Sequence, residues 1–292
     1  MQPSFIFSPT KYEPYTPADI GLAYEKVILK TSDGLLLSAW FVPANNAETT
    51  PKALKNSVLD SRLSEAGTMI YGTIDARLKN ACGITILFCH GKGGSISYSL
   101  DTVNILNELG FNVFIFDYRG YGNSQGKPAE QGTYIDAQTA YDWLIEIKGF
   151  SPDDIIIFGR SLGGSIAAHL ASNVGAKGLI VESGFTSFAD IGCKFYPYMP
   201  VRLFARFKYN TQEYLKKVKY PVLIIHSRND EIVPFEFGLR LYEEAASGPK
   251  DFLEIYGCHN DGFLHSGQIY RQGLLNWAKS LDKMQLQGNV NT

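Results

Sequence analysis

The stretch IIIFGRSLGGSIAAHLAS, residues 155–172, joins a short apolar run to an alanine-rich segment with the composition of a helix. At the junction, residues 159–163 (GRSLG) fit the pattern G-x-S-x-G. In a nucleophile elbow this pattern places a serine on a strained turn between a strand and a helix, and the glycines avoid collisions with neighbouring backbone. The alternative is a glycine-rich turn that happens to contain a serine. The strand before the turn and the helix after it favour Ser161 as a nucleophile.

The alternation of apolar runs and helical segments continues on both sides of this stretch. Continuous apolar runs of this length are typical of strands buried on both faces, and their alternation with helices predicts a mostly parallel sheet covered by helices. In such sheets, functional residues lie at the carboxyl ends of the strands. The runs are ITILFC (84–89), NVFIFD (112–117), IIIFG (155–159), GLIVE (178–182), VLIIHS (222–227) and FLEIY (252–256), and helices are expected near 98–109, 130–147, 162–173, 235–246 and 264–282.

The segments before residue 84 have a different character. Four prolines within residues 3–17 predict an extended segment that lies on the body of the protein. The runs EKVILK and LLLSAWFV, joined by Ser-Asp-Gly at 32–34, predict a β-hairpin. Residues 45–82 are polar and weakly patterned, and we interpret them as an insertion between the second and third strands. We expect one domain over residues 1–292.

Composition excludes several classes of protein. The 292 residues include 27 basic and 29 acidic side chains, so the net charge of −2 gives no electrostatic support for a nucleic-acid partner. The four cysteines form no C-x-x-C pair, which favours a reducing, cytoplasmic location. The N-terminus lacks the pattern of a signal peptide, and no apolar run is long enough to predict a membrane span.

A serine nucleophile needs a base and an acid, and the sequence offers a candidate for each further along the chain. A serine hydroxyl is a poor nucleophile at neutral pH, so an imidazole must take its proton and a carboxylate must orient that imidazole. Elbow enzymes place these groups in the order Ser, Asp or Glu, His. Asp230 follows the run VLIIHS, and His259 follows the run FLEIY. Alternatives for the acid are Glu182, at the end of GLIVE, and Glu231; Asp230 could also be a turn carboxylate that caps a helix.

The other histidines fit the role of base less well. His90 precedes a glycine-rich loop and is expected to brace it, His226 lies within a strand, and His169 and His265 lie in predicted helices. A metal site built from His259, Asp261 and His265 is a further alternative, but these residues show no recognised ligand spacing. We therefore expect neither a metal nor a cofactor.

A glycine-rich loop, HGKGGS (90–95), follows the run ITILFC. Acyl transfer creates an oxyanion, which needs two backbone N–H donors. The residue after the serine, Leu162, is expected to provide one donor, and Lys92 in this loop is expected to provide the other. A phosphate-binding loop is the alternative, but the sequence contains neither of the glycine patterns typical of such loops.

Taken together, these stretches resemble the α/β-hydrolase family of serine hydrolases. They are similar in particular to the abhydrolase-domain subgroup, which includes membrane-anchored eukaryotic enzymes, protein depalmitoylases and many bacterial proteins. The resemblance covers about residues 12–280 and rests on YTPADIGLAYEKV (15–27), HGKGGS (90–95), FDYRGYGNSQG (116–126), FGRSLGGSIAAHLAS (158–172), VESGFTS (181–187), HSRNDEIVP (226–234) and CHNDGF (258–263).

The resemblance implies an α/β-hydrolase fold with a mostly parallel eight-stranded sheet, helices on both faces and a small cap. It implies the triad Ser161, Asp230 and His259, with the N–H groups of Lys92 and Leu162 as the oxyanion hole. Relatives often have Asn in place of Lys92, so we expect the ammonium group here to favour anionic substrates. In this fold the second strand is antiparallel, so the insertion at 45–82 should emerge opposite the active site.

The cap is expected in residues 184–219, as a few short helices. Candidate pocket residues are Tyr118, Tyr121, Phe195, Tyr198 and Met199, with Tyr196, Phe204 and Phe207 as further members of an acyl-chain groove. The basic residues Arg202, Arg206 and Lys208 suggest contact with an anionic membrane surface. The alternative is that the cap helices simply pack on the body.

These residues predict an acyl-ester or thioester hydrolase that acts on a small-molecule or lipid-like acyl substrate or on an acylated protein. Two other functions remain open. One is a catalytically silent binding or scaffold protein on the same fold, because fold alone does not determine function. The other is a peptidase or amidase with the same triad.

Overall fold

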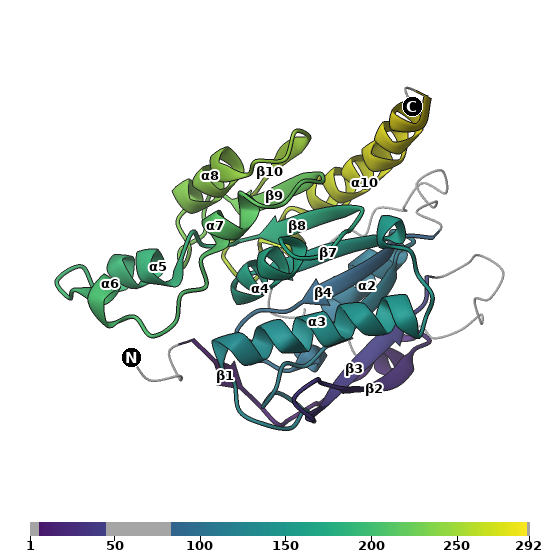
Figure 1. Cartoon of the computed structure of the whole chain (residues 1–292), viewed down its shortest axis with the longest axis horizontal. Coiled ribbons are helices and arrows are strands. Elements are labelled where there is room, and N and C mark those ends of the chain that lie inside the picture. Colours follow the sequence, from purple (N-terminus) through teal and green to yellow (C-terminus); the bar gives the residue numbers. More distant parts are fainter. Residues whose placement is uncertain (1–5, 45–82, 291–292) are drawn as a thin grey trace.

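The computed structural model describes residues 6–44 and 83–290, which form a central sheet between two layers of helices (Figure 1). The eight strands follow the order β10-β9-β8-β7-β4-β6-β3-β2. β3 is antiparallel to both of its neighbours, and the other neighbouring pairs are parallel. The predicted sheet and hairpin are confirmed. The strands are β2 (Glu25–Lys30), β3 (Leu36–Val42), β4 (Thr85–Cys89), β6 (Asn112–Phe116), β7 (Ile155–Arg160), β8 (Gly178–Glu182), β9 (Val222–Ser227) and β10 (Lys250–Ile255).

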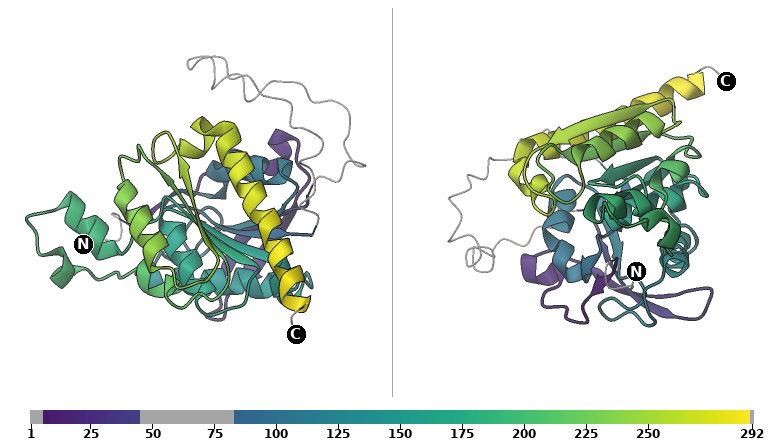
Figure 2. Two further views of the ribbon diagram at one scale, coloured as in Figure 1. Left: turned by 90° about the horizontal axis from the view of Figure 1, so that it is seen from above. Right: turned by 90° about the vertical axis from the view of Figure 1, so that its left-hand side faces the viewer.

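The inner strands consist mostly of buried apolar residues because helices cover both faces of the sheet. Successive side chains of a strand point to opposite faces, so each inner strand contributes to two cores. In β4, Leu87 packs with one core, and Ile86 and Phe88 pack with the other. Helices α3 (Glu130–Glu146), α4 (Leu162–Ala171) and α8 (Phe235–Glu244) cover the first face, and α2 (Leu100–Glu108) and α10 (Gly267–Val290) cover the second (Figures 1 and 2).

Two predictions about the C-terminal part need correction. The run at 252–256 was expected to be buried on both faces, but β10 is an edge strand and most of its side chains are only partly buried. The helix expected near 264–282 is two helices, α9 (Gly262–His265) and α10, and α10 continues to Val290. The break falls at Gly267, whose φ of 44° is readily adopted only by glycine.

The remaining elements lie in the N-terminal segment and in the connections between the strands and helices. Residues 184–219 form three short helices, as expected for a small cap, and α5 and α6 project from the body (Figures 1 and 2). The N-terminal segment is extended, and its short strand β1 pairs in parallel with β5. These elements are β1 (Ser8–Pro9), β5 (Gly93–Gly94), α5 (Phe188–Phe195), α6 (Val201–Phe204), α7 (Thr211–Leu215) and the 3-10 helices η2 (Pro17–Ile20), η4 (Ile96–Ser99) and η5 (Pro152–Asp154).

The expectation for the insertion at residues 45–82 lies outside the described residues. Within the described ranges 6–44 and 83–290, no helix has the length and apolarity needed to cross a membrane.

Candidate active site

Ser161 occupies the turn between β7 and α4. Its φ of 53° and ψ of −117° are a conformation that few residues other than glycine adopt. The turn is held by a hydrogen bond of 2.9 Å from the Ser161 N–H to the carbonyl oxygen of Glu182. A side chain at Gly159 would collide with the backbone of Gly163, and one at Gly163 would collide with the carbonyl group of Cys89. The close packing of β7, α4 and the end of β4 therefore requires both glycines of the G-x-S-x-G pattern.

The structure brings Ser161, His259 and Asp230 into one hydrogen-bonded chain. Nε2 of His259 lies 2.9 Å from Oγ of Ser161, and Nδ1 lies 2.7 Å from Oδ2 of Asp230. The three residues follow β7, β10 and β9, whose carboxyl ends share one edge of the sheet. A carboxylate only accepts hydrogen bonds, so Nδ1 carries the hydrogen and Nε2 is free to accept the serine proton. This geometry can activate a serine hydroxyl.

The environment of Asp230 keeps its carboxylate ionised. Burial opposes ionisation, but hydrogen bonds from His259 and from the Val233 N–H outweigh burial and lower the pKa of Asp230. Oδ1 accepts the N–H groups of Ile232 and Val233 at 2.9 and 2.7 Å. His226 donates from Nε2 to the Val233 carbonyl oxygen at 2.9 Å. Sequence reasoning gave His226 no role, whereas the structure shows that it supports the loop of the acid.

The two alternative acids have other partners. Glu182 accepts hydrogen bonds from Nε of Arg160 and from the hydroxyl of Tyr270, both at 2.7 Å. Glu231 accepts the backbone N–H of His259 at 2.9 Å. The carboxylate that contacts the imidazole ring is therefore that of Asp230, and Glu231 instead anchors the backbone of the histidine.

The glycine-rich loop at residues 90–95, here called the oxyanion loop after the role that the sequence predicts for it, passes beside the serine. A methyl group on Gly91 would lie 3.8 Å from the Cβ of Ser161. Burial lowers the pKa of His90 to about 4, so its ring is neutral at pH 7. Nδ1 of His90 donates to the Gly91 carbonyl oxygen at 2.8 Å. Because that carbonyl and the Lys92 N–H belong to one planar peptide, this bond fixes the direction of the N–H. Leu162 is the first residue of α4, so its N–H has no acceptor within the helix.

Tyr118 and Tyr121 do not line an open pocket, in contrast to the sequence-based expectation. Both side chains are fully buried. The hydroxyl of Tyr118 donates to the carbonyl oxygen of His90 at 2.8 Å, and that of Tyr121 donates to the carbonyl oxygen of Lys92 at 2.7 Å. The two tyrosines therefore support the oxyanion loop through their hydroxyl groups. The pattern of apolar residues in the sequence gives no sign of these hydrogen bonds.

The three cap candidates for the pocket are exposed. Phe195, Tyr198 and Met199 have exposed fractions of 52%, 100% and 51%. The buried side of α5 is used by Phe188, and α5 and α6 project from the body in Figure 1. We call residues 194–208 the cap arm (Figure 1). The arm is tied to the triad region at its base, where Nζ of Lys194 donates to the Ile232 carbonyl oxygen at 2.9 Å.

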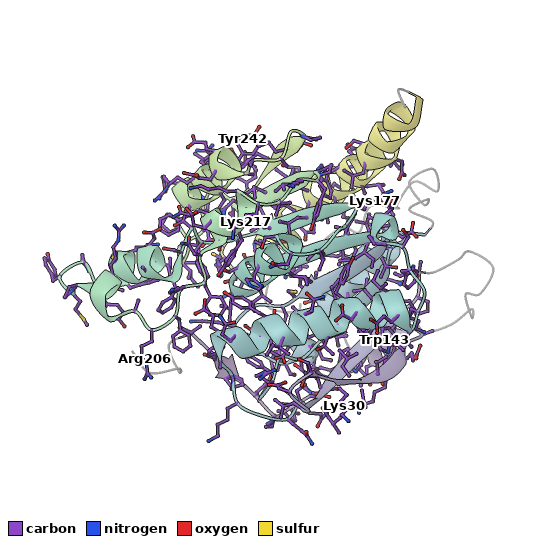
Figure 3. The ribbon with its side chains drawn as sticks, viewed as in Figure 1. Lys30, Trp143, Lys177, Arg206, Lys217 and Tyr242 are labelled. Atoms are coloured by element: carbon purple, nitrogen blue, oxygen red, sulfur yellow. The ribbon has the colours of Figure 1, made fainter. Side chains whose placement is uncertain are left out.

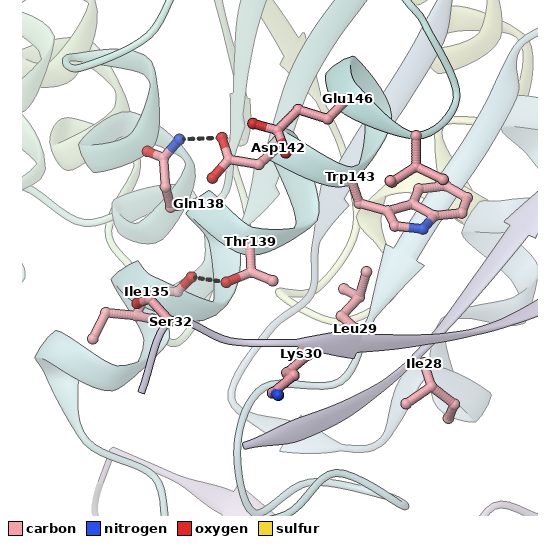
Figure 4. Close-up of a pocket in the computed structure, with 11 residues that line it drawn as sticks. Ile28, Leu29, Lys30, Ser32, Ile135, Gln138, Thr139, Asp142, Trp143 and Glu146 are labelled. Atoms are coloured by element: carbon pink, nitrogen blue, oxygen red, sulfur yellow. Dashed lines mark hydrogen bonds between the residues drawn. The ribbon is translucent and has the colours of Figure 1, made fainter. Parts of the chain in front are cut away.

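A separate groove of about 430 Å³ lies between β2 and α3 (Figure 4). Part of its polar lining is already hydrogen-bonded within α3, where Gln138 donates to Asp142 and Thr139 donates to the Ile135 carbonyl oxygen, both at 2.8 Å. β2 and β10 form opposite edges of the sheet, and no triad residue lines the groove. The groove offers no nucleophile paired with a base, so the candidate active site is the one at Ser161.

The metal alternative receives no geometric support. Across residues 6–44 and 83–290, no three His, Cys, Asp or Glu side chains cluster in a way that could hold a metal ion. Nδ1 of His265 lies 3.4 Å from Asp261, whereas Nδ1 of His259 is bonded to Asp230.

A mostly parallel sheet with a serine elbow and a histidine–carboxylate pair at one edge is the architecture of an α/β hydrolase. The family model for the alpha/beta hydrolase fold matches residues 84–180. The alpha/beta hydrolase domain-containing protein WAV2 of Arabidopsis thaliana is 32% identical over 281 residues, which cover 89% of this chain and 80% of WAV2. The lysophosphatidylserine lipase ABHD12 of Macaca fascicularis is 32% identical over 211 residues, 64% of this chain and 52% of ABHD12.

A solved structure is similar over almost the whole chain. The Pyrococcus furiosus esterase Pf2001 superposes with a TM-score of 0.68 at 20% identity, covering 94% of this chain and 98% of the esterase. This chain belongs to the α/β-hydrolase family, and its relatives include the alpha/beta hydrolase domain-containing protein WAV2.

Proposed function

We propose that the protein hydrolyses carboxylic esters or thioesters through an acyl-enzyme on Ser161, with His259 as base and Asp230 as the acid that orients it. The observation that carries the proposal is the continuous chain from Asp230 to His259 at 2.7 Å and from His259 to Ser161 at 2.9 Å. An esterase-like hydrolase agrees with the name of the similar solved structure.

The chemistry follows from these contacts. Oγ of Ser161 attacks the acyl carbon while its proton moves to Nε2 of His259, and the resulting oxyanion accepts the N–H groups of Leu162 and Lys92. Collapse of this intermediate breaks the bond to the alcohol or thiol, which leaves with the proton from Nε2. A water molecule then attacks the acyl-enzyme by the same steps, which releases the carboxylic acid and restores the serine.

Two observations support a lipid-like or anionic acyl substrate. The similar protein ABHD12 is named as a lipase of lysophosphatidylserine, an anionic lipid. The side chain of Lys92, within the oxyanion loop, is exposed, and an ammonium group attracts negative charge. Our hypothesis is that Lys92→Ala lowers kcat/KM for anionic esters more than for neutral ones; equal losses for both would contradict it. The proposal also includes an acylated protein as a second class of substrate. It places the protein in the cytoplasm.

Peripheral contact with an anionic membrane is also part of the proposal. Among the described residues, twelve large apolar side chains are exposed, and four of them lie within residues 195–199. The cap arm also has four basic residues and no acidic one. Arg206 points away from the body (Figure 3), and Lys208 is exposed. Exposed aromatics beside cations favour the interface of an anionic bilayer, from which a lipid ester would reach the site.

Labelling with a fluorophosphonate probe tests the proposal directly. The wild type should be labelled and Ser161→Ala should not, and a series of esters and thioesters should then be hydrolysed by the wild type alone. Absence of labelling in folded wild type would favour a binding or scaffold protein. Hydrolysis of amides in preference to esters would favour a peptidase or amidase.

A further inference from the structure

We infer that residues 7–15, here called the strap, are a positioning element that holds the oxyanion loop in its catalytic geometry. This inference rests on the proposed function, because it assigns the strap to the same site. No residue of the strap touches the triad in the contacts described above, so its effect would be transmitted through the backbone of the loop.

The strap is bonded directly to the carbonyl groups of the oxyanion loop. The N–H of Ser8 donates to the Lys92 carbonyl oxygen at 3.0 Å, and the N–H of Thr10 donates to that of Gly94 at 3.2 Å. The hydroxyl of Tyr121 supplies a second donor to the Lys92 carbonyl, at 2.7 Å. The peptide group that follows the proposed oxyanion donor is therefore fixed by two donors from outside the loop.

Side-chain hydrogen bonds join the second half of the strap to the end of the oxyanion loop and to the residues that follow it. The hydroxyl of Ser95 donates to the Tyr12 carbonyl oxygen at 3.1 Å, and that of Ser97 donates to the Tyr15 carbonyl oxygen at 2.6 Å. Glu13 accepts the N–H and the side-chain amide of Asn123 at 3.0 and 2.7 Å, which ties the strap to the turn after β6. The strap is thus held along its whole length.

The first residue of the strap reaches the cap. Phe7 is almost fully buried and packs edge-on against Phe207 and Tyr209, at centroid distances of 5.8 and 6.3 Å. The cap arm and the oxyanion loop therefore meet the same extended segment, although they lie about a hundred residues apart in the sequence.

The composition of the oxyanion loop explains why it needs an external support. Three of its six residues are glycines, which lose more conformational entropy on ordering than other residues do. A donor stabilises the oxyanion only at about 2.7–3.1 Å, and a misplacement of about 1 Å can reduce the rate about a hundredfold. Because this stabilisation is needed in the transition state, a loosened loop should lower kcat with little change in KM.

The test compares two substitutions at one exposed position. Ser8→Pro removes the N–H that donates to Lys92, whereas Ser8→Ala keeps it and removes only the hydroxyl. We expect Ser8→Pro to lower kcat about tenfold or more on an ester, with KM nearly unchanged, and to speed hydrogen exchange in a peptide covering residues 90–97. Ser8→Ala should match the wild type in all three measurements.

Tyr121→Phe provides a second route if Ser8→Pro folds poorly. It removes the other donor to the same carbonyl without changing side-chain shape, and it should also lower kcat and leave KM nearly unchanged. If the wild type hydrolyses esters while Ser8→Pro and Tyr121→Phe both retain wild-type kcat and loop exchange, the inference is overturned and the proposed function stands. If the folded wild type hydrolyses no ester or thioester, the proposed function itself is overturned, and with it the catalytic role of the strap.

Discussion

At the scale of single residues, the site depends on backbone positions that few residues tolerate. Ser161 adopts a positive φ of 53°, and the glycines on either side of it are required by contacts with Cys89 and with the helix that follows. The His259 backbone is anchored by Glu231, and its ring is oriented by Asp230. Each residue of the proposed triad is thus held by a neighbour that has no role in the proposed reaction.

The division between Asp230 and Glu231 gives a prediction. In Asp230→Asn, the amide can donate to Nδ1 and so favour the wrong tautomer of His259, and we expect kcat to fall about 10³–10⁴-fold. In Glu231→Gln, the side-chain oxygen can still accept the backbone N–H of His259, so kcat should stay within about threefold of the wild type. Steady-state kinetics on one ester, with thermal unfolding to verify folding, would test both. Comparable losses in the two variants would argue against the assignment of Asp230 as the acid.

At the scale of elements, Glu13 of the strap faces Asp117 of the body, and this contact should make the free energy of unfolding depend on pH. Oδ1 of Asp117 accepts the Ile96 N–H at 2.9 Å, and Nε2 of His90 lies 3.9 Å from the same oxygen. Burial, together with the nearby negative charge of Glu13, raises the pKa of Asp117 to about 8, while the Ile96 N–H and Lys11 act in the opposite direction. Two carboxyl groups therefore face each other where the strap meets the body.

The sign of the resulting pH dependence follows from linkage. Between the ordinary pKa of 3.8 and about 8, the folded protein keeps a proton on Asp117 that the unfolded chain has released. The contribution of this group to the free energy of unfolding should therefore fall as pH rises through that window and level off above it. Glu13→Gln removes the facing charge, so the decline should become shallower than in the wild type.

Urea unfolding at about pH 5, 7 and 9 measures this difference. The exposed carboxylate of Asp153, on η5, offers a control, because Asp153→Asn should leave the wild-type slope unchanged. Parallel pH profiles for the wild type and Glu13→Gln would show that the two carboxyl groups are not coupled.

The cap arm is the second element with a testable role. Burial of an exposed aromatic or Met side chain at an interface contributes about 1.5–3 kcal/mol, and each nearby cation adds about 1 kcal/mol on an anionic surface. The double variant Tyr198→Ser, Met199→Ser should therefore bind vesicles containing phosphatidylserine at least about tenfold more weakly than the wild type. The control Ile147→Ser changes a side chain that is 70% exposed at the end of α3, and it should not affect binding.

Sedimentation with vesicles measures this binding, and an inactive Ser161→Ala background separates it from hydrolysis. Phosphatidylcholine vesicles should bind less protein because they offer no anionic surface, and added salt should lower the bound fraction because it screens the attraction between the cations and the anionic lipid. Equal binding by the wild type and the double variant would restrict the arm to packing or substrate entry.

At the scale of the whole molecule, local sequence patterns predict the strands and the nucleophile turn better than they predict the long-range hydrogen bonds that hold the site. Apolar runs located the inner strands to within a residue or two, because strands buried on both faces leave a continuous apolar signal. The G-x-S-x-G turn located Ser161 for a similar local reason. The sequence predicts that the strap lies on the body, but not its hydrogen bonds to the oxyanion loop, and not the hydroxyl donors of Tyr118 and Tyr121. Their partners lie 28 residues or more away, and polar pairing leaves no periodicity. The sequence also did not predict the exposure of Tyr198, because an aromatic residue is equally compatible with a position in the core.

One buried network joins β7, which precedes Ser161, to the neighbouring strand β8 and to helix α10. Substitutions in this network should change the free energy of unfolding much more than kcat. Arg160, Glu182 and Tyr270 connect β7, β8 and α10, and the guanidinium of Arg160 also lies 4.0 Å from the ring centroid of Phe263 on α9. Glu182→Gln leaves the Arg160 charge buried without its counter-ion, which should lower the free energy of unfolding by about 3–5 kcal/mol. Tyr270→Phe removes one hydrogen bond to a charged group and should lower it by about 1.5–3 kcal/mol.

Catalysis should respond differently from stability in these variants. The N–H of Ser161 bonds to the backbone oxygen of Glu182, which the substitution to Gln retains, so the elbow should keep its geometry below the unfolding transition. We therefore expect Glu182→Gln to shift the urea midpoint strongly while kcat, measured well below that midpoint, stays within about tenfold of the wild type. The opposite result, a stable variant with kcat reduced as in Asp230→Asn, would transfer the role of triad acid from Asp230 to Glu182.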